Sequence, residues 1–239
     1  MNEPTEDGLL GGRVRLLQPR RGYRVAVDAV LLAAAVDATA GQRVLDLGAG
    51  VGAVGLCLAM RMPGVSVTGI ELQPAFAELA ERNARLNGVE DRVSTLVHDL
   101  ARALPGNLGA FEHVATNPPY LSAAVADPSP DAGKALATVE SSADLARWLA
   151  VAAAALKPEG TLTLIHRSDR LEEIATLLAQ LGWGDIAIKA LPPAARVLVR
   201  ARKGAPARRH APPLRLHREE GGYTEAAEAI LRHAAPLAF

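Results

Sequence analysis

The stretch that decides the fold of this chain is Val44-Leu45-Asp46-Leu47-Gly48-Ala49-Gly50-Val51-Gly52. Its apolar half predicts a short buried strand at 43–47, and the next residues carry a helical pattern over 53–62, which Pro63-Gly64 ends. Glycines between a strand and a helix allow a tight turn, and they let a ligand approach the backbone beside the positive end of the helix. The stretch therefore predicts a ligand-binding turn inside an α/β fold.

Predicted strands and helices alternate through the rest of the middle of the chain. Strands are expected at 66–70, 92–97, 112–116, 160–165, 185–189 and 194–203, and helices at 76–86, 141–156 and 169–181. This alternation favours a parallel sheet with helices on both faces, and the short Pro192-Pro193 connection favours an antiparallel strand at the sheet edge. We therefore expect an α/β, Rossmann-like three-layer sandwich with a mainly parallel seven-stranded sheet and an antiparallel edge strand.

Composition narrows the class of protein and its compartment. The 239 residues include 49% hydrophobic and 22% charged residues with zero formal net charge, which is typical of a soluble globular protein. The single cysteine, Cys57, excludes an internal disulfide framework and a Cys-rich zinc site, so no metal and a cytoplasmic location are expected. The first residues are acidic, unlike a secretory signal, and each apolar stretch is too short for a membrane span.

Acidic residues at predicted strand ends distinguish between two candidate cofactors, a nicotinamide dinucleotide and S-adenosyl-L-methionine. Gly50-Val-Gly52-Ala-Val-Gly55 matches the dinucleotide pattern G-x-G-x-x-G, which alone is a weak indication of a nicotinamide cofactor. Glu71 ends the next strand about 20 residues on, where a carboxylate can accept hydrogen bonds from both ribose hydroxyls. Asp46 stands where it would repel a pyrophosphate but attract the ammonium and sulfonium of S-adenosyl-L-methionine. The electrostatics therefore favour S-adenosyl-L-methionine.

A third acidic strand end is predicted to complete the cofactor site. Taken alone, Asp99 is equally typical of a helix cap or a solvated loop. Because it follows Asp46 and Glu71 at successive strand ends, we expect it to accept a hydrogen bond from the adenine amino group. The full set of predicted cofactor contacts is Asp46, Gly48, Gly50, Glu71, Leu72, Asp99, Leu100 and Asn117.

The loop after the fourth strand, Asn117-Pro118-Pro119-Tyr120, resembles the motif of amino-methyltransferases, which act on exocyclic base amines or on a glutamine amide. Two prolines stiffen the loop and remove two backbone donors. The side-chain oxygen of Asn117 and the carbonyl of Pro118 can then accept both protons of an amine and aim its lone pair at a methyl group. Tyr120 offers a ring on which a flat substrate can stack. We therefore predict Asn117, Pro118 and Tyr120 as the catalytic residues.

The segment from Gln18 to Leu32, with Asp28 ahead of a Leu-Leu pair, resembles the entry segment of the bacterial tRNA1(Val) adenine-37 N6-methyltransferase family. The resemblance covers roughly residues 9–125 and continues through Glu71-Leu72-Gln73, Asn83, Asn87-Gly88, Asp99 and Asn117–Tyr120. It implies a class I methyltransferase fold, S-adenosyl-L-methionine as the donor and tRNA as the substrate. It also implies that Asp46, Gly48, Gly50, Glu71 and Asp99 bind the donor, and that Asn117 and Tyr120 bind the target amine.

Basic residues cluster in two places that suit contacts with RNA phosphates. One cluster lies in the predicted lead-in, residues 1–40, and the other extends from the end of the main domain, 41–204, into a basic arm with a terminal helix, 205–239. Predicted RNA contacts are Tyr23, Arg24, Arg208 and Arg209. A solvated arginine-rich surface is the alternative explanation.

Three other functions remain open on the sequence alone. They are methylation of a guanine N2 in ribosomal RNA, methylation of a protein glutamine, and a non-catalytic RNA-binding module that keeps the fold. The short lead-in argues against a release factor as substrate, because the glutamine methyltransferases carry a separate helical N-terminal domain.

Overall fold

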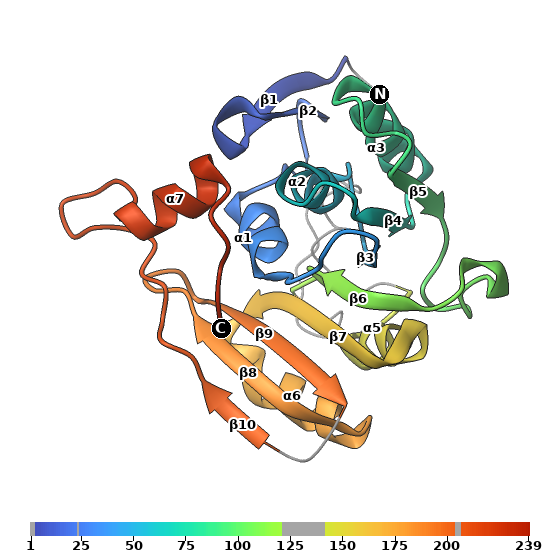
Figure 1. Cartoon of the computed structure of the whole chain (residues 1–239), viewed down its shortest axis with the longest axis vertical. Coiled ribbons are helices and arrows are strands. Elements are labelled where there is room, and N and C mark those ends of the chain that lie inside the picture. The colour runs from blue at the N-terminus through green and yellow to red at the C-terminus, as the bar shows by residue number, and fades with distance from the viewer. Residues whose placement is uncertain (1–2, 23, 121–141, 204–206) are drawn as a thin grey trace.

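The computed structural model describes residues 3–22, 24–120, 142–203 and 207–239, and its middle layer is an eight-stranded sheet (Figure 1). The strand order is β10-β8-β9-β7-β6-β3-β4-β5. The bounds are β3 (Arg43–Leu47), β4 (Ser66–Glu71), β5 (Val93–Val97), β6 (Phe111–Thr116), β7 (Leu156–Arg167), β8 (Trp183–Ala190), β9 (Arg196–Lys203) and β10 (Ala207–His210). The predicted α/β class with a mainly parallel sheet is confirmed.

The sheet differs from the expected one at one side. β9 is antiparallel to both β7 and β8, so the antiparallel strand lies inside the sheet and not at its edge. A short connection forces β9 to run against β8, and β9 then fills the space between β8 and β7. The eighth strand, β10, pairs in parallel with β8 through Ala207–His210. The sequence predicted only a basic arm at 205–239, because a strand there also requires a free sheet edge, which the sequence does not display.

Helices cover both faces of the sheet. α1 (Val27–Ala35), α2 (Ala53–Arg61), α3 (Pro74–Leu86) and α7 (Glu225–His233) pack against one face, and α5 (Leu145–Ala155) and α6 (Leu171–Gln180) against the other. Alternate strand residues supply the two cores: Val44 faces the first and Leu45 the second. Asp144 caps α5 by accepting from the Arg147 amide at 2.8 Å. No helix of the described ranges is long and apolar enough to cross a membrane.

The N-terminal strands form a separate hairpin that is bound to the main sheet through α3. β1 (Thr5–Leu9) and β2 (Val14–Gln18) pair antiparallel. The amides of Asn83 and Asn87 each exchange two hydrogen bonds with the backbone of β2, at Leu17 and Arg15, over 2.7–2.9 Å. Asn83 also donates to the carbonyl of Val51 at 2.9 Å, so one buried side chain joins the hairpin to the glycine turn.

Candidate active site

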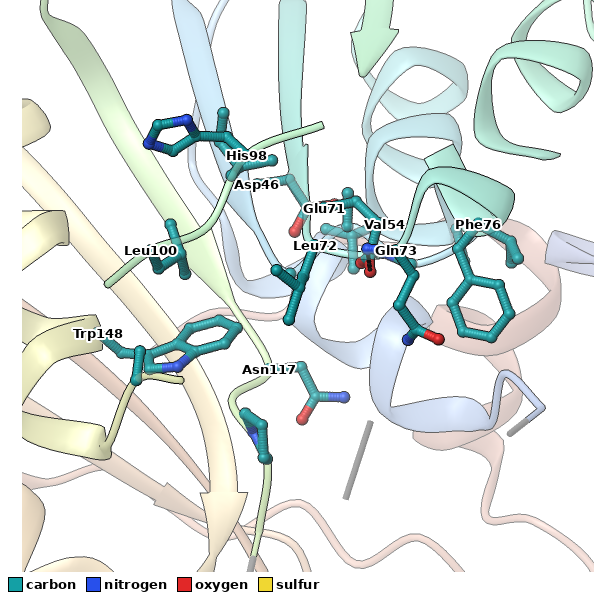
Figure 2. Close-up of a pocket in the computed structure, with 18 of the residues that line it drawn as sticks. Asp46, Val54, Glu71, Leu72, Gln73, Phe76, His98, Leu100, Asn117 and Trp148 are labelled. Atoms are coloured by element: carbon teal, nitrogen blue, oxygen red, sulfur yellow. Dashed lines mark hydrogen bonds between the residues drawn. The ribbon is translucent and has the colours of Figure 1, made fainter. Parts of the chain in front are cut away.

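A crevice opens where β3, β4, β5 and β6 end, because parallel strands place their carboxyl ends at one edge of the sheet (Figure 2). All the predicted cofactor contacts line it: Asp46, Gly48, Gly50, Glu71, Leu72, Asp99, Leu100 and Asn117. Figure 2 shows the labelled members of this set around one common space. The structure therefore brings the predicted set together, and the cofactor role of each residue remains a prediction.

The three glycines of the turn differ in what a side chain at each position would contact. Gly48, Gly50 and Gly52 all have positive φ, at 75°, 55° and 86°. A Cβ added to Gly48 would lie 2.5 Å from the indole of Trp148, and one added to Gly52 would lie 3.2 Å from the Cβ of Ala80. At Gly50 no described atom lies within 4 Å of an added Cβ. Packing therefore requires a small residue at Gly48 and Gly52, whereas Gly50 borders the open space that a ligand can enter.

Asp46 is a buried acid with an incomplete set of partners. Its side chain lines the crevice, the residue is 2% exposed, and Oδ2 has no hydrogen-bond partner within the described ranges. Burial, together with the charge of Glu71, raises the pKa of Asp46 to about 7. A buried acceptor without a partner is costly, so a cationic group placed in the crevice would be bound favourably. The ammonium of S-adenosyl-L-methionine fits this requirement.

Glu71 is held in place by the backbone around it. Its Oε2 accepts from the Gly50 amide and its Oε1 from the Gln73 amide, both at 2.8 Å. Burial raises the pKa of Glu71, and these backbone hydrogen bonds oppose that shift. A carboxylate has about four acceptor positions, more than these backbone amides fill, so acceptor capacity remains for a ribose hydroxyl. The carboxylate is thereby oriented before any ligand arrives.

Asp99 also lines the crevice and is less buried than Asp46 and Glu71. Its Oδ1 accepts from the Ser142 hydroxyl at 2.7 Å and from the Ala101 amide at 2.9 Å. These hydrogen bonds, the Ala101 amide first, lower the pKa of Asp99. The residue thus acts as a turn cap, and its Oδ2 is the oxygen that an adenine amino group would use.

The Asn-Pro-Pro-Tyr loop contributes unequally to the crevice. Asn117 and Pro119 line it, whereas Pro118 and Tyr120 are not among the lining residues. The Tyr120 hydroxyl lies 2.7 Å from Oδ2 of Asp28 and 2.6 Å from Oδ1 of Asn117. The guanidinium of Arg196 lies over the Tyr120 ring, 4.4 Å from its centroid, and covers one face. Stacking of a substrate on Tyr120 is therefore limited to the other face.

A buried histidine supports the same loop. His166, at the end of β7, packs edge-on against Tyr120 with 5.3 Å between ring centroids. Burial, and then the charge of Arg170, lower the pKa of His166 to about 4. The imidazole is therefore neutral at physiological pH and belongs to the packing of the loop.

The residues predicted to contact RNA are dispersed, and their charges are paired. Tyr23 lies outside the described residues. Arg24 pairs with Asp7 at 2.6 Å, Arg208 with Glu172 at 2.6 Å, and Arg209 with Asp185 at 3.6 Å. Arg208 and Arg209 lie on β10, four strand positions from β6, which corresponds to roughly 19 Å across the sheet. Acidic neighbours thus offset much of the positive charge expected there.

Several site residues were not predicted from the sequence. Gln73, Phe76 and Trp148 line the crevice, and Arg196 and His166 pack on the Asn-Pro-Pro-Tyr loop. Gln73 and Phe76 follow Glu71 closely, so a longer window after that strand would have included them. Trp148, His166 and Arg196 come from distant segments without a motif, and only the packing of α5, β7 and β9 brings them here.

The part of the chain that builds this crevice is similar to known methyltransferases. The methyltransferase small-domain family matches residues 24–182, which is more than half of the chain. The chain belongs to this family. Family membership confirms the methyltransferase family predicted from the sequence and supports S-adenosyl-L-methionine as the cofactor of the crevice.

Curated relatives of this family member carry a more specific name. The chain is 35% identical over 159 residues to the tRNA1(Val) (adenine(37)-N6)-methyltransferase of Porphyromonas gingivalis. The aligned region covers 63% of this chain and 61% of that one. The chain is 30% identical over 167 residues to the enzyme of the same name from Yersinia enterocolitica, covering 69% and 65%. The chain thus spans less than two thirds of the length of these relatives, and the resemblance seen in the sequence is confirmed.

Solved structures extend the match to most of the chain. A predicted O-methyltransferase from Agrobacterium tumefaciens superimposes with a TM-score of 0.72 and 27% identity, over 89% of this chain and 99% of that one. An S-adenosylmethionine-dependent O-methyltransferase from Thermotoga maritima gives a TM-score of 0.56 at 20% identity, over 79% and 69%, which shows the fold alone. The class I methyltransferase fold is therefore confirmed.

Proposed function

We propose that this protein transfers the methyl group of S-adenosyl-L-methionine to the N6 amine of an adenine in tRNA. One observation carries the proposal: the buried Oδ2 of Asp46, without a partner in the described ranges, belongs to the same crevice that Asn117 lines. A site for a cationic donor and a site for an amine thus share one edge of the sheet. A cytoplasmic location follows from this substrate.

The donor side is arranged to hold a charged nucleoside. Asp46 pairs with the ammonium, Glu71 accepts from the ribose hydroxyls, and Asp99 accepts from the adenine amino group. Leu72 and Leu100 line the crevice between these acids and provide apolar contact. When bound there, S-adenosyl-L-methionine supplies an electrophilic methyl group.

The acceptor side is arranged to orient a planar amine. The Asn117 oxygen and the Pro118 carbonyl each accept one amine proton, which aims the nitrogen lone pair into the crevice. Asn117 gains most when the nitrogen becomes tetrahedral, so its contribution belongs to the transition state. No buried base is required, because the proton can leave after the methyl group has been transferred.

The names of the relatives support adenine in tRNA over the alternatives. Both curated relatives described above are named as tRNA adenine-N6 methyltransferases, and the family match over residues 24–182 includes every residue that lines the crevice. An adenine in structured RNA must leave its stack to reach such a crevice, at a cost of a few kcal/mol. Arg24, Arg208 and Arg209 are the phosphate contacts that would position the RNA without reading its sequence.

The test is incubation of the full chain with labelled S-adenosyl-L-methionine and separate fractions of tRNA, ribosomal RNA and protein. We expect label in tRNA and N6-methyladenine after nuclease digestion and mass spectrometry. If the product is N2-methylguanine or N5-methylglutamine, methylation of an amine at the Asn-Pro-Pro-Tyr loop is supported, but adenine in tRNA is not the substrate. A methylated hydroxyl, or no transfer despite donor binding, would reject the proposal.

A further inference from the structure

A polar cluster that extends beyond the motif surrounds the catalytic loop. It consists of Asp28 on α1, Asn117 and Tyr120 in the loop, and Arg196 at the start of β9. The Tyr120 hydroxyl contacts both Asp28 and Asn117, and the Nε of Arg196 donates to the same Oδ2 of Asp28 at 3.0 Å. The side chains of Asp28 and Arg196 are only 15% and 28% exposed, so solvent contributes little to these hydrogen bonds.

The protons of this cluster can be counted. Tyr120 has one hydroxyl proton, but Oδ2 of Asp28 and Oδ1 of Asn117 are both acceptors. The proton goes to the Asp28 carboxylate, because hydrogen bonds to an ionised acceptor are the stronger ones. The Tyr120 oxygen, which also has a hydrogen bond with Arg196, then lies 2.6 Å from Asn117 as an acceptor, and this short contact is attractive only if the amide nitrogen faces Tyr120. Turning the amide by 180° exchanges its oxygen and nitrogen and gives each of these contacts one donor and one acceptor.

We infer that Asp28 and Arg196 are positioning residues that, through Tyr120, turn the side-chain oxygen of Asn117 toward the crevice and so select an amine as the methyl acceptor. This inference rests on the proposed function. With the oxygen in the crevice, Asn117 accepts a proton from an amine. With the Asn117 nitrogen in the crevice, its N–H would face the N–H of the target amine. The site would then suit a methyl acceptor that presents an oxygen. Asp28 thus determines the polarity of Asn117 through Tyr120.

Arg196 has a separate part in this arrangement. Because its Nε donates to Oδ2 of Asp28, that oxygen can act only as an acceptor toward Tyr120. In Asp28→Asn, the side-chain oxygen must also face Arg196, because the Nε of Arg196 is a donor and requires an acceptor there. Asp28→Asn therefore retains the polarity of the cluster, whereas Asp28→Ala removes the acceptor and lets the Tyr120 proton turn to the Asn117 oxygen.

The experiment compares four variants in single-turnover methylation of tRNA. Asp28→Ala should lower the rate about a hundredfold, the scale of removing one oriented hydrogen-bonding group from a transition state. Asp28→Asn should retain most of the rate. Tyr120→Phe should cost only about two- to threefold, since the Asn117 amide can then adopt either orientation and the productive one remains populated. The double variant, Asp28→Ala with Tyr120→Phe, should be as active as Tyr120→Phe alone and therefore faster than Asp28→Ala.

A matched control and a second readout separate this effect from general damage. Asp37→Ala breaks an ion pair with Arg200 (2.9 Å), farther along β9, and therefore removes an acidic partner of the same strand at a more exposed position away from the Asn-Pro-Pro-Tyr loop. Its methylation rate should stay at the wild-type value. Sinefungin carries an amine where the donor carries its methyl group, so its affinity relative to S-adenosylhomocysteine should fall in Asp28→Ala and recover in Asp28→Asn.

Each result has one interpretation. A double variant as slow as Asp28→Ala, or an Asp28→Ala with the wild-type rate and sinefungin preference, would overturn the inference. If the wild-type chain methylates no tRNA, the proposed function fails, and the sinefungin ratio still tests the orientation of Asn117 by itself.

Discussion

The donor half of the site (Asp46, Gly48, Gly50 and Glu71) comes from residues 46–71 and lines the crevice. The acceptor half comes from three distant segments: Asn117 lines the crevice, and Asp28, Tyr120 and Arg196 hold one another outside its lining. In the donor half the hydrogen bonds of Glu71 run to backbone amides nearby, at Gly50 and Gln73. In the acceptor half side chains hold one another across the fold. A crevice can therefore combine a site that one motif encodes with a site that only tertiary packing completes.

The largest expected effect tests the acceptor half. Asn117→Ala should lower single-turnover methylation about a hundred- to a thousandfold, because it removes an oriented group that acts in the transition state. Binding of tRNA and of S-adenosyl-L-methionine should change little, as measured by filter binding and calorimetry. Asn107→Ala, an exposed asparagine on a remote turn, is the matched control and should have the wild-type rate. A large drop in the affinity of Asn117→Ala for S-adenosyl-L-methionine would show that Asn117 also binds the donor, which would contradict the division into two halves.

The next effect tests the donor half. Glu71→Ala should weaken binding of S-adenosyl-L-methionine by about 1–3 kcal/mol, the scale of a charge-assisted hydrogen bond, and it should leave tRNA binding unchanged. Calorimetry on the folded variant measures this, with Glu78→Ala, an exposed acid on α3, as the control. Unchanged donor affinity in a folded Glu71→Ala would remove Glu71 from the site.

A smaller effect comes from the proton on Asp46. Its pKa of about 7 in the free protein means that the carboxyl is partly protonated at neutral pH. A cationic donor binds only the ionised form, so affinity should rise with pH through 7, by at most about tenfold per unit below that value. Calorimetry from pH 6 to 8 measures the slope.

Two controls isolate Asp46 from the other groups that face the crevice. Glu71, His98 and Asp99 also line it, so Asp46→Asn must remove the pH dependence while they remain. Adenosine lacks the ammonium and sulfonium, so its binding should be independent of this titration. A pH slope that persists in Asp46→Asn would assign the proton to another group.

The same contrast explains how much of the site could be predicted from the sequence. Asp46, Glu71 and the glycine turn are close in sequence and follow strand ends, so their meeting follows from strand–helix alternation alone. The role of Trp148 against Gly48 depends on how α5 packs on the sheet, and the contact of Asp28 with Tyr120 depends on where α1 lies. β10 was missed for a related reason: an exposed segment becomes a strand only where β8 has a free edge.

The smallest expected effect concerns residues that belong to neither half. Charge reversal at Arg208 and Arg209 should weaken tRNA binding and make it less dependent on salt. The log–log slope should fall by roughly 0.7–0.9 for each phosphate that the variant no longer neutralises. The effect should be modest, because Glu172 and Asp185 already pair with these arginines at an exposed sheet edge. Filter binding over a range of salt concentrations measures both quantities.

The acidic partners provide the decisive control for this edge. Glu172→Gln releases Arg208 from its ion pair without changing the arginine, so tRNA binding should become slightly tighter and more sensitive to salt. Opposite changes in the two kinds of variant would show that RNA reaches β10, which lies four strand positions from β6, the strand that precedes the Asn-Pro-Pro-Tyr loop. If neither variant alters the affinity or the salt slope, Arg208 and Arg209 only form surface ion pairs and do not contact RNA. The substrate is then bound by the two halves of the site and by the lead-in around Arg24.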